Sequence, residues 1–185
     1  SQSWVDEWHR TQVSEHSYYC SDFKFRKGMV SDKNTPAYTL HMADGMWLNK
    51  SFKNSILQRI AKCELDGKRY VYSDLGFVLL QQVVEKVTEL PMDLYLAREF
   101  YAPMGLQRTM FLPLTKFTKA EIMPTASNDF LRRQDICGYV HDETAACMGG
   151  VSGNAGLFST AEEVAKVYQM LLNGGESVSY THLRA

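Results

Sequence analysis

The chain has 185 residues, of which 45% are hydrophobic and 22% charged, and its formal net charge is −1. This composition suits one globular domain with a sizeable core. The balanced charge offers no basic stripe, which argues against nucleic acid as a partner. No apolar run approaches the roughly 18 residues that a membrane span needs.

The N-terminal third has little periodicity. Residues 1–50 mix aromatic and polar side chains, and Pro36 and Gly45 interrupt them. We expect a long irregular segment there, with one short strand or helix. Ser51 is expected to cap a helix that runs to about Cys63. One face of that helix would carry Phe52, Ile56, Ile60 and Cys63.

The middle of the chain contains the most regular apolar pattern. Residues 75–89 place apolar side chains at the i, i+3, i+4 spacing of a helix, which we expect to be buried. Pro91 suits the first turn of a second helix that ends near Phe100, because a missing N–H costs nothing there. Residues 102–135 read as loop and short turns, anchored by Phe111, Leu112, Leu114 and Phe117.

The last predicted helix follows Ser159 or Thr160. Glu162 or Glu163 stands three residues further on, which is the spacing of a capping box, and Gly174-Gly175 ends the helix. The predicted elements are therefore mostly helical.

A polar triplet, Tyr72-Ser73-Asp74, immediately precedes the 75–89 pattern. This order puts a phenol and a carboxylate on a turn that the helix behind it fixes. A phenol can transfer a proton during acyl transfer if its surroundings lower its pKa. The alternative that such a tyrosine only anchors the turn, with its hydroxyl satisfied, is open from the triplet alone.

The triplet and the segments after it resemble the serine β-lactamase and D-Ala-D-Ala peptidase superfamily of the class C type. The triplet differs by one residue from that superfamily's Tyr-x-Asn element. The resemblance continues in order along the chain, in YSDLG (72–76), VTELP (87–91), FYAPMGLQRT (100–109), GYVHDE (138–143), MGGVSGNAGLFSTA (148–161) and MLLNGG (170–175). The version closest in kind is the β-lactamase-related domain that some proteins carry fused to a family 3 glycoside hydrolase.

This resemblance implies an α+β, β-lactamase/transpeptidase-like fold and an acyl-enzyme mechanism without a cofactor. Tyr72 would pass a proton from nucleophile to leaving group, and Asp74 would stand where the family usually has Asn. Ser152 and Asn154 would line the substrate cleft. The implied substrates are β-lactams, D-alanyl peptides of peptidoglycan or simple esters, and the implied location is the periplasm or cell envelope. A carboxylate at position 74 can accept hydrogen bonds but cannot donate them, which puts β-lactam hydrolysis in doubt.

Two elements of the family are missing. Its nucleophile belongs to a Ser-x-x-Lys motif on a buried helix, whereas Ser21-Asp22-Phe23-Lys24 has no apolar helical stripe around it. No Thr-Gly pair follows Thr160, so the third element is absent. We expect residues 1–176 to be part of an incomplete domain, residues 177–185 to be a non-native tail, and the fragment to be inactive.

The same residues fit other types of site less well. Gly150-x-Ser152-x-Asn154 misses the G-x-S-x-G nucleophile elbow at its last position. His141, beside two acids, lacks the second histidine of a metalloprotease helix, so a hydrogen-bonding role is favoured over a metal. Four cysteines lack C-x-x-C spacing, and we favour buried thiols over a disulfide: Cys20, Cys63, Cys137 and Cys147. A catalytically dead binding relative, and an unrelated helical protein, are the alternatives.

Overall fold

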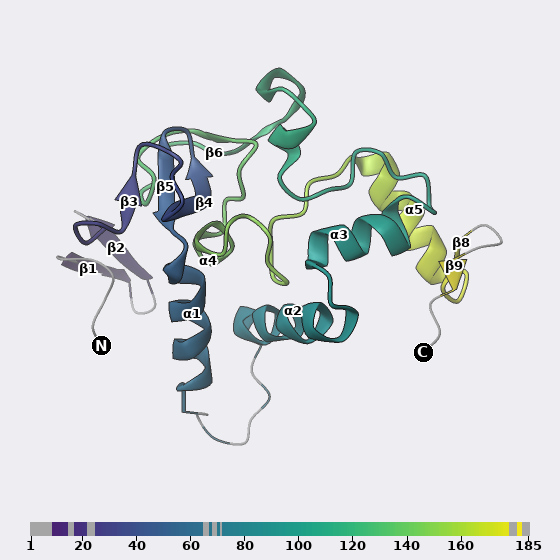
Figure 1. Ribbon diagram of the computed structural model, residues 1–185, viewed down its shortest axis with the longest axis horizontal. Helices are drawn as coiled ribbons and strands as arrows, with labels where there is room; N and C mark the ends of the chain where they lie inside the picture. The colour runs from purple at the N-terminus through teal and green to yellow at the C-terminus, as the bar shows by residue number, and fades with distance from the viewer. Residues whose placement is uncertain are drawn as a thin grey trace.

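The computed structural model describes residues 9–14, 17–21, 25–64, 67, 70, 72–177 and 181–182. It combines short antiparallel sheets with helices, as the predicted α+β class requires. Figure 1 shows strands β1 to β6 at one side of the molecule, α2 below, and α3 and α5 at the other side. None of the described helices is long and apolar enough to cross a lipid bilayer.

The described part of residues 1–50 contains the strands β1 to β5, so the prediction of a long irregular segment with one short strand or helix was wrong there. β1 (His9–Ser14) pairs with β2 (Ser17–Ser21), and β5 (Met46–Asn49) lies between β3 (Val30–Ser31) and β4 (Tyr38–Ala43). Asp44-Gly45 forms the β4–β5 turn, with Gly45 at φ +58°. An Asp-Gly pair between two apolar runs is the local signal for a hairpin. Short strands with an irregular register concealed the period of two.

Helix α1 (Ser51–Ala61) confirms the predicted helix but corrects its ends. Ser51 is the first helical residue rather than the cap, and its N–H donates to Oδ1 of Asn49. Phe52 and Ile56 are buried as expected, whereas Cys63 lies beyond the helix and is exposed. Cys147 is buried, Cys137 is half-buried and Cys63 is exposed, so the preference for buried thiols was wrong at position 63.

Helix α2 (Asp74–Thr88) forms where the apolar residues follow the helical spacing most regularly. Helix α3 (Met92–Leu96) follows Pro91 and continues as a π-helical turn to Tyr101. The expectation that α2 is buried was wrong. Only Val78 and Gln81 are buried in it, because the described residues cover one face of the helix. The exposed apolar side chains of α2 are Leu75, Phe77, Leu79, Leu80, Val83 and Val87.

Residues between α3 and α4 form loops and short turns, as predicted. Two 3-10 turns (Pro113–Thr115 and Lys119–Glu121) precede the short pair β6 (Pro124–Ala126) and β7 (Ile136–Cys137). A buried ion pair fixes this segment. The Arg132 guanidinium donates to both carboxylate oxygens of Asp129 at 2.9 and 2.6 Å, and to the carbonyls of Val140 and His141.

The largest core cluster includes residues of a short helix, α4, that was not predicted from the sequence. Helix α4 (Glu143–Cys147) packs against β4, and its Ala145 is fully buried. Asp142 caps α4, since its carboxylate accepts from the Ala145 N–H at 2.6 Å. The core cluster joins the sheet, α1, α2 and α4 through Met42, Leu48, Phe52, Ile56, Val78, Ala145, Ala146 and Met148.

Helix α5 (Ala161–Leu172) starts at the predicted cap and ends before Gly174-Gly175, as expected. Thr160 accepts from the Glu163 N–H at 3.3 Å. The reciprocal half of the capping box was wrong, because the Glu163 carboxylate turns to another segment. It accepts from the N–H groups of Gln107 and Arg108 and from the Thr109 hydroxyl. β8 (Glu176–Ser177) then pairs with β9 (Thr181–His182).

Candidate active site

Tyr72 and Asp74 lie together at the start of α2. The helix begins at Asp74 because Ser73 is extended and its hydroxyl accepts from the Leu75 N–H at 3.3 Å. The Tyr72 hydroxyl donates to Oδ1 of Asp74 at 3.1 Å, and its ring lies 5.9 Å from the Phe77 ring. Tyr72 is 67% exposed. The pair is therefore a phenol and a carboxylate presented to solvent on a capped turn.

The electrostatics of the pair keep the phenol neutral. The hydrogen bond to Asp74, and then the negative charge of that carboxylate, raise the pKa of Tyr72 above its ordinary value. A phenol that shuttles a proton during acyl transfer needs a lowered pKa instead, and a nearby cation can lower it. In this geometry Tyr72 is a hydrogen-bond donor rather than a base.

The glycine-rich segment 149–156 lies directly against α2. A Cβ on Gly153 would come within 2.1 Å of the Phe77 carbonyl oxygen, so only glycine fits there. One turn further along, the Gln81 amide, which is 1% exposed, donates to the Val151 carbonyl at 3.3 Å and to the Glu85 carboxylate at 3.0 Å. Two segments that are distant in sequence are thus held together behind the Tyr72–Asp74 turn.

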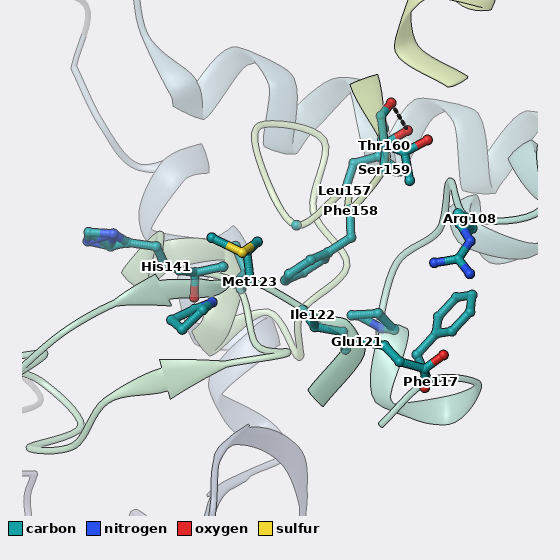
Figure 2. A pocket seen from close by; sticks show the side chains of 15 residues that line it. Arg108, Phe117, Glu121, Ile122, Met123, His141, Leu157, Phe158, Ser159 and Thr160 are labelled. Carbon is teal, nitrogen blue, oxygen red and sulfur yellow. Dashed lines mark hydrogen bonds between the residues drawn. The ribbon is translucent and has the colours of Figure 1, made fainter. Parts of the chain in front are cut away.

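Ser152 and Asn154 form internal hydrogen bonds in this structure. The Ser152 hydroxyl donates to Oδ1 of Asn154 at 2.6 Å, and Nδ2 of Asn154 donates to the Asp142 carboxylate at 3.2 Å. Ser152 is 2% exposed. Their side chains therefore tie the 149–156 segment to the cap of α4. Neither residue lines the cavity of about 590 Å³ in Figure 2.

Gln81 and Asp142 are the site residues that sequence reasoning missed. Asp142 had a signal, since an Asp directly before a short Ala-rich run is a typical helix cap. Gln81 had none, because a polar residue inside an apolar helix reads as solvent-facing. Among the described residues, no group of three or more His, Cys, Asp or Glu side chains could hold a metal ion. His141 is exposed and contributes its carbonyl to Arg132.

Only the first residue of the Ser-x-x-Lys sequence at Ser21–Lys24 lies among the described residues. Ser21 is the last residue of strand β2, and Lys24 lies outside the described residues.

Comparison with known proteins gives the family. The family model described as Beta-lactamase matches residues 14–185. Proteins of Salmonella agona and Salmonella schwarzengrund, which carry the provisional name D-alanyl-D-alanine carboxypeptidase, are 36% and 37% identical over 155 residues. Each alignment covers 76% of this chain and 36% of the relative, so the chain spans about a third of these proteins.

A solved structure shows a weaker likeness. It is the octameric penicillin-binding protein homologue from Pyrococcus abyssi, at 20% identity and a TM-score of 0.49. The match covers 71% of this chain and 29% of that one. The predicted superfamily and fold class are confirmed by the family match over residues 14–185. The chain therefore belongs to the beta-lactamase family, within the superfamily of serine β-lactamases and D-Ala-D-Ala peptidases.

Proposed function

We propose that this chain supplies the Tyr-x-Asp element of a serine acyl hydrolase that acts on peptidoglycan peptides. The observation that carries the proposal is the Tyr72–Asp74 pair, exposed on the capped first turn of α2 and backed by the 149–156 segment. The provisional name of the Salmonella relatives, D-alanyl-D-alanine carboxypeptidase, favours D-alanyl peptides over β-lactams and simple esters as substrates.

In the proposed reaction, a serine beyond these residues attacks the carbonyl carbon of the scissile amide. Its oxygen forms an ester bond, the C–N bond breaks, and the serine proton reaches the leaving amine through Tyr72. Water then hydrolyses the ester. A lysine beside the serine would oppose the effect of Asp74 and lower the pKa of Tyr72, because an opposite charge favours the phenolate.

The exposed apolar face of α2 supports the proposal that residues 1–176 are part of a larger domain. Exposed patches of large apolar side chains mark surfaces that another polypeptide segment covers. The curated relatives extend well beyond the length that this chain matches. We propose that the missing nucleophile and the third motif lie on that additional polypeptide, and that these 185 residues alone do not hydrolyse substrate.

A catalytically dead binding relative is the second candidate, and one observation favours it. Asp74 accepts the one proton of the Tyr72 hydroxyl and raises the pKa of the phenol, which suits a neutral phenol oxygen that accepts a hydrogen bond from a bound peptide. Such a module would bind D-alanyl peptides without forming an acyl-enzyme. A fused family 3 glycoside hydrolase domain stays a prediction.

Acylation by a fluorescent penicillin separates the two candidates. The polypeptide encoded by the native gene that contains this chain should become covalently labelled, and Tyr72→Phe should slow labelling about 100-fold or more through loss of proton transfer. Tyr168→Phe, at a tyrosine of similar exposure on α5, is the matched control and should leave the rate unchanged. Absence of labelling, together with retained binding of a D-Ala-D-Ala peptide, would favour the binding relative.

A further inference from the structure

A cavity of about 590 Å³ lies between the segment after α3 and the segment before α5 (Figure 2). Its volume is within the range of small-molecule sites. The walls come from segments far apart in sequence, and none of the lining residues belongs to α2. Apolar lining is provided by Pro113, Phe117, Ile122, Met123, Val140 and Phe158. The pocket can therefore bury an apolar body.

Arg108 provides a cation at one end of this cavity. Its guanidinium carbon lies 5.2 Å from the centroid of the Phe117 ring, which is within the range of a cation–π contact. Among the described residues, this guanidinium donates no hydrogen bond and has no ion-pair partner within 4 Å. Its N–H groups therefore have no acceptor among the described residues, and a ligand carboxylate matches a guanidinium in geometry and charge.

The main chain of Arg108 is firmly held. Its N–H donates to both carboxylate oxygens of buried Glu163 at 3.0 Å, and the preceding N–H of Gln107 donates to the same group at 2.8 Å. The base of the arginine is thus fixed before any ligand arrives, which reduces the entropy lost on binding.

The other polar groups near Arg108 are already engaged. The Lys116 ammonium, which flanks the same Phe117 ring, donates to the Gln107 carbonyl at 2.8 Å and does not line the cavity. The Glu121 carboxylate accepts from the N–H and hydroxyl of Thr118 at 3.0 and 2.9 Å. Glu121 lines the cavity near Arg108 and would repel a ligand carboxylate (Figure 2). The negative charge of Glu121 therefore weakens the binding of a carboxylate ligand. A neutral residue at position 121 would remove this repulsion.

We propose that this cavity binds a small monocarboxylate with an apolar body, its carboxylate on Arg108 and its body between Phe117 and Phe158. The probes are N-benzoyl-L-phenylalanine and its carboxamide, which differ only in the charged group. Titration of the isotope-labelled 185-residue chain should shift the backbone NMR signals of 108, 117 and 157–160. The acid should bind about threefold to tenfold more tightly than the amide, as for a partly exposed charge-assisted pair.

Two substitutions of opposite expected effect test the charges. Arg108→Gln should abolish the preference for the acid, and Glu121→Gln should strengthen acid binding by removing the like charge. Lys86→Gln, which removes a cation on α2, is the charge-matched control and should leave the preference intact. Equal binding of acid and amide to the unsubstituted chain, or signal shifts confined to α2, would overturn the proposal. The Glu121 variant keeps the test decisive if the Arg108 variant does not fold.

Discussion

At the scale of single residues, Asp74 makes the Tyr72 hydroxyl a weaker acid. The carboxylate accepts from the phenol and raises its pKa. The family usually has Asn at this position, whose amide carries no charge. The residue at position 74 therefore affects how readily the Tyr72 hydroxyl loses its proton: a carboxylate there makes the loss harder than a neutral amide does.

Asp74→Asn should lower the pKa of Tyr72 toward its ordinary value. The substitution removes the charge and replaces the carboxylate by an amide oxygen, which is a weaker acceptor. NMR titration of a labelled Tyr72 ring carbon measures the shift directly. Glu89→Gln, which removes a carboxylate at the far end of α2, should leave the Tyr72 titration unchanged. An unaltered pKa in the Asp74 variant would show that the observed hydrogen bond does not persist in solution.

At the scale of elements, one glycine sets the distance between α2 and the 149–156 segment. Gly153→Ala should destabilise the chain by about 2 kcal/mol, because the new Cβ would overlap the Phe77 carbonyl oxygen. Gly76→Ala is the matched control within α2. No atom lies within 4 Å of its added Cβ, so it should stabilise the helix by about 0.5–1 kcal/mol. Urea unfolding gives both values, and equal midpoints for the two variants would contradict the packing described.

The Glu163 carboxylate joins α5 to the 107–109 segment and makes stability depend on pH. Burial raises the pKa of this carboxyl, but hydrogen bonds from Thr109, Arg108 and Gln107 outweigh burial, and the net shift is downward. Because the pKa of Glu163 is lower in the folded state, its carboxylate contributes fully to stability above the unfolded pKa of about 4.5. That contribution to stability is lost as the pH falls through the lowered folded-state pKa.

Glu163→Gln should therefore cost about 1–3 kcal/mol at neutral pH and reduce the loss of stability on acidification. Glu162→Gln is the control, because Glu162 is exposed and only pairs with Lys166 at 3.0 Å. Its effect should stay within about 0.5 kcal/mol. Chemical unfolding at several pH values checks both. Parallel stability profiles for the wild-type chain and the Glu163 variant would contradict the assigned hydrogen bonds.

Local patterns predicted the helices better than the sheets or the site. The extent of α2 followed from its apolar spacing, and the ends of α5 followed from Thr160 before it and glycine after it. The strands were missed because β3 and β5 are short and the register between β4 and β5 is interrupted. The Tyr72–Asp74 contact was predictable, since the two residues are neighbours. The Asn154–Asp142 and Gln81–Val151 hydrogen bonds were not, because they depend on tertiary packing between distant segments.

At the scale of the whole molecule, the described structure has a packed side and an open side. The β3–β5 sheet, α1, α4 and one face of α2 share one core, whereas the rest of α2 and α5 display large apolar side chains. On α5 the exposed apolar residues are Val164, Tyr168, Leu171 and Leu172. Together with the short span of the match to the relatives, this surface supports the proposal that a larger polypeptide completes the active site.

The most direct test locates the acyl group. The polypeptide encoded by the native gene is treated with penicillin, digested and analysed by mass spectrometry, beside the 185-residue chain alone. The proposed function predicts one acylated serine, in a Ser-x-x-Lys sequence outside these 185 residues, and no adduct on the isolated chain. An adduct on Ser21, or no adduct on either protein, would contradict the assignment of Tyr72 and Asp74 to a serine acyl hydrolase.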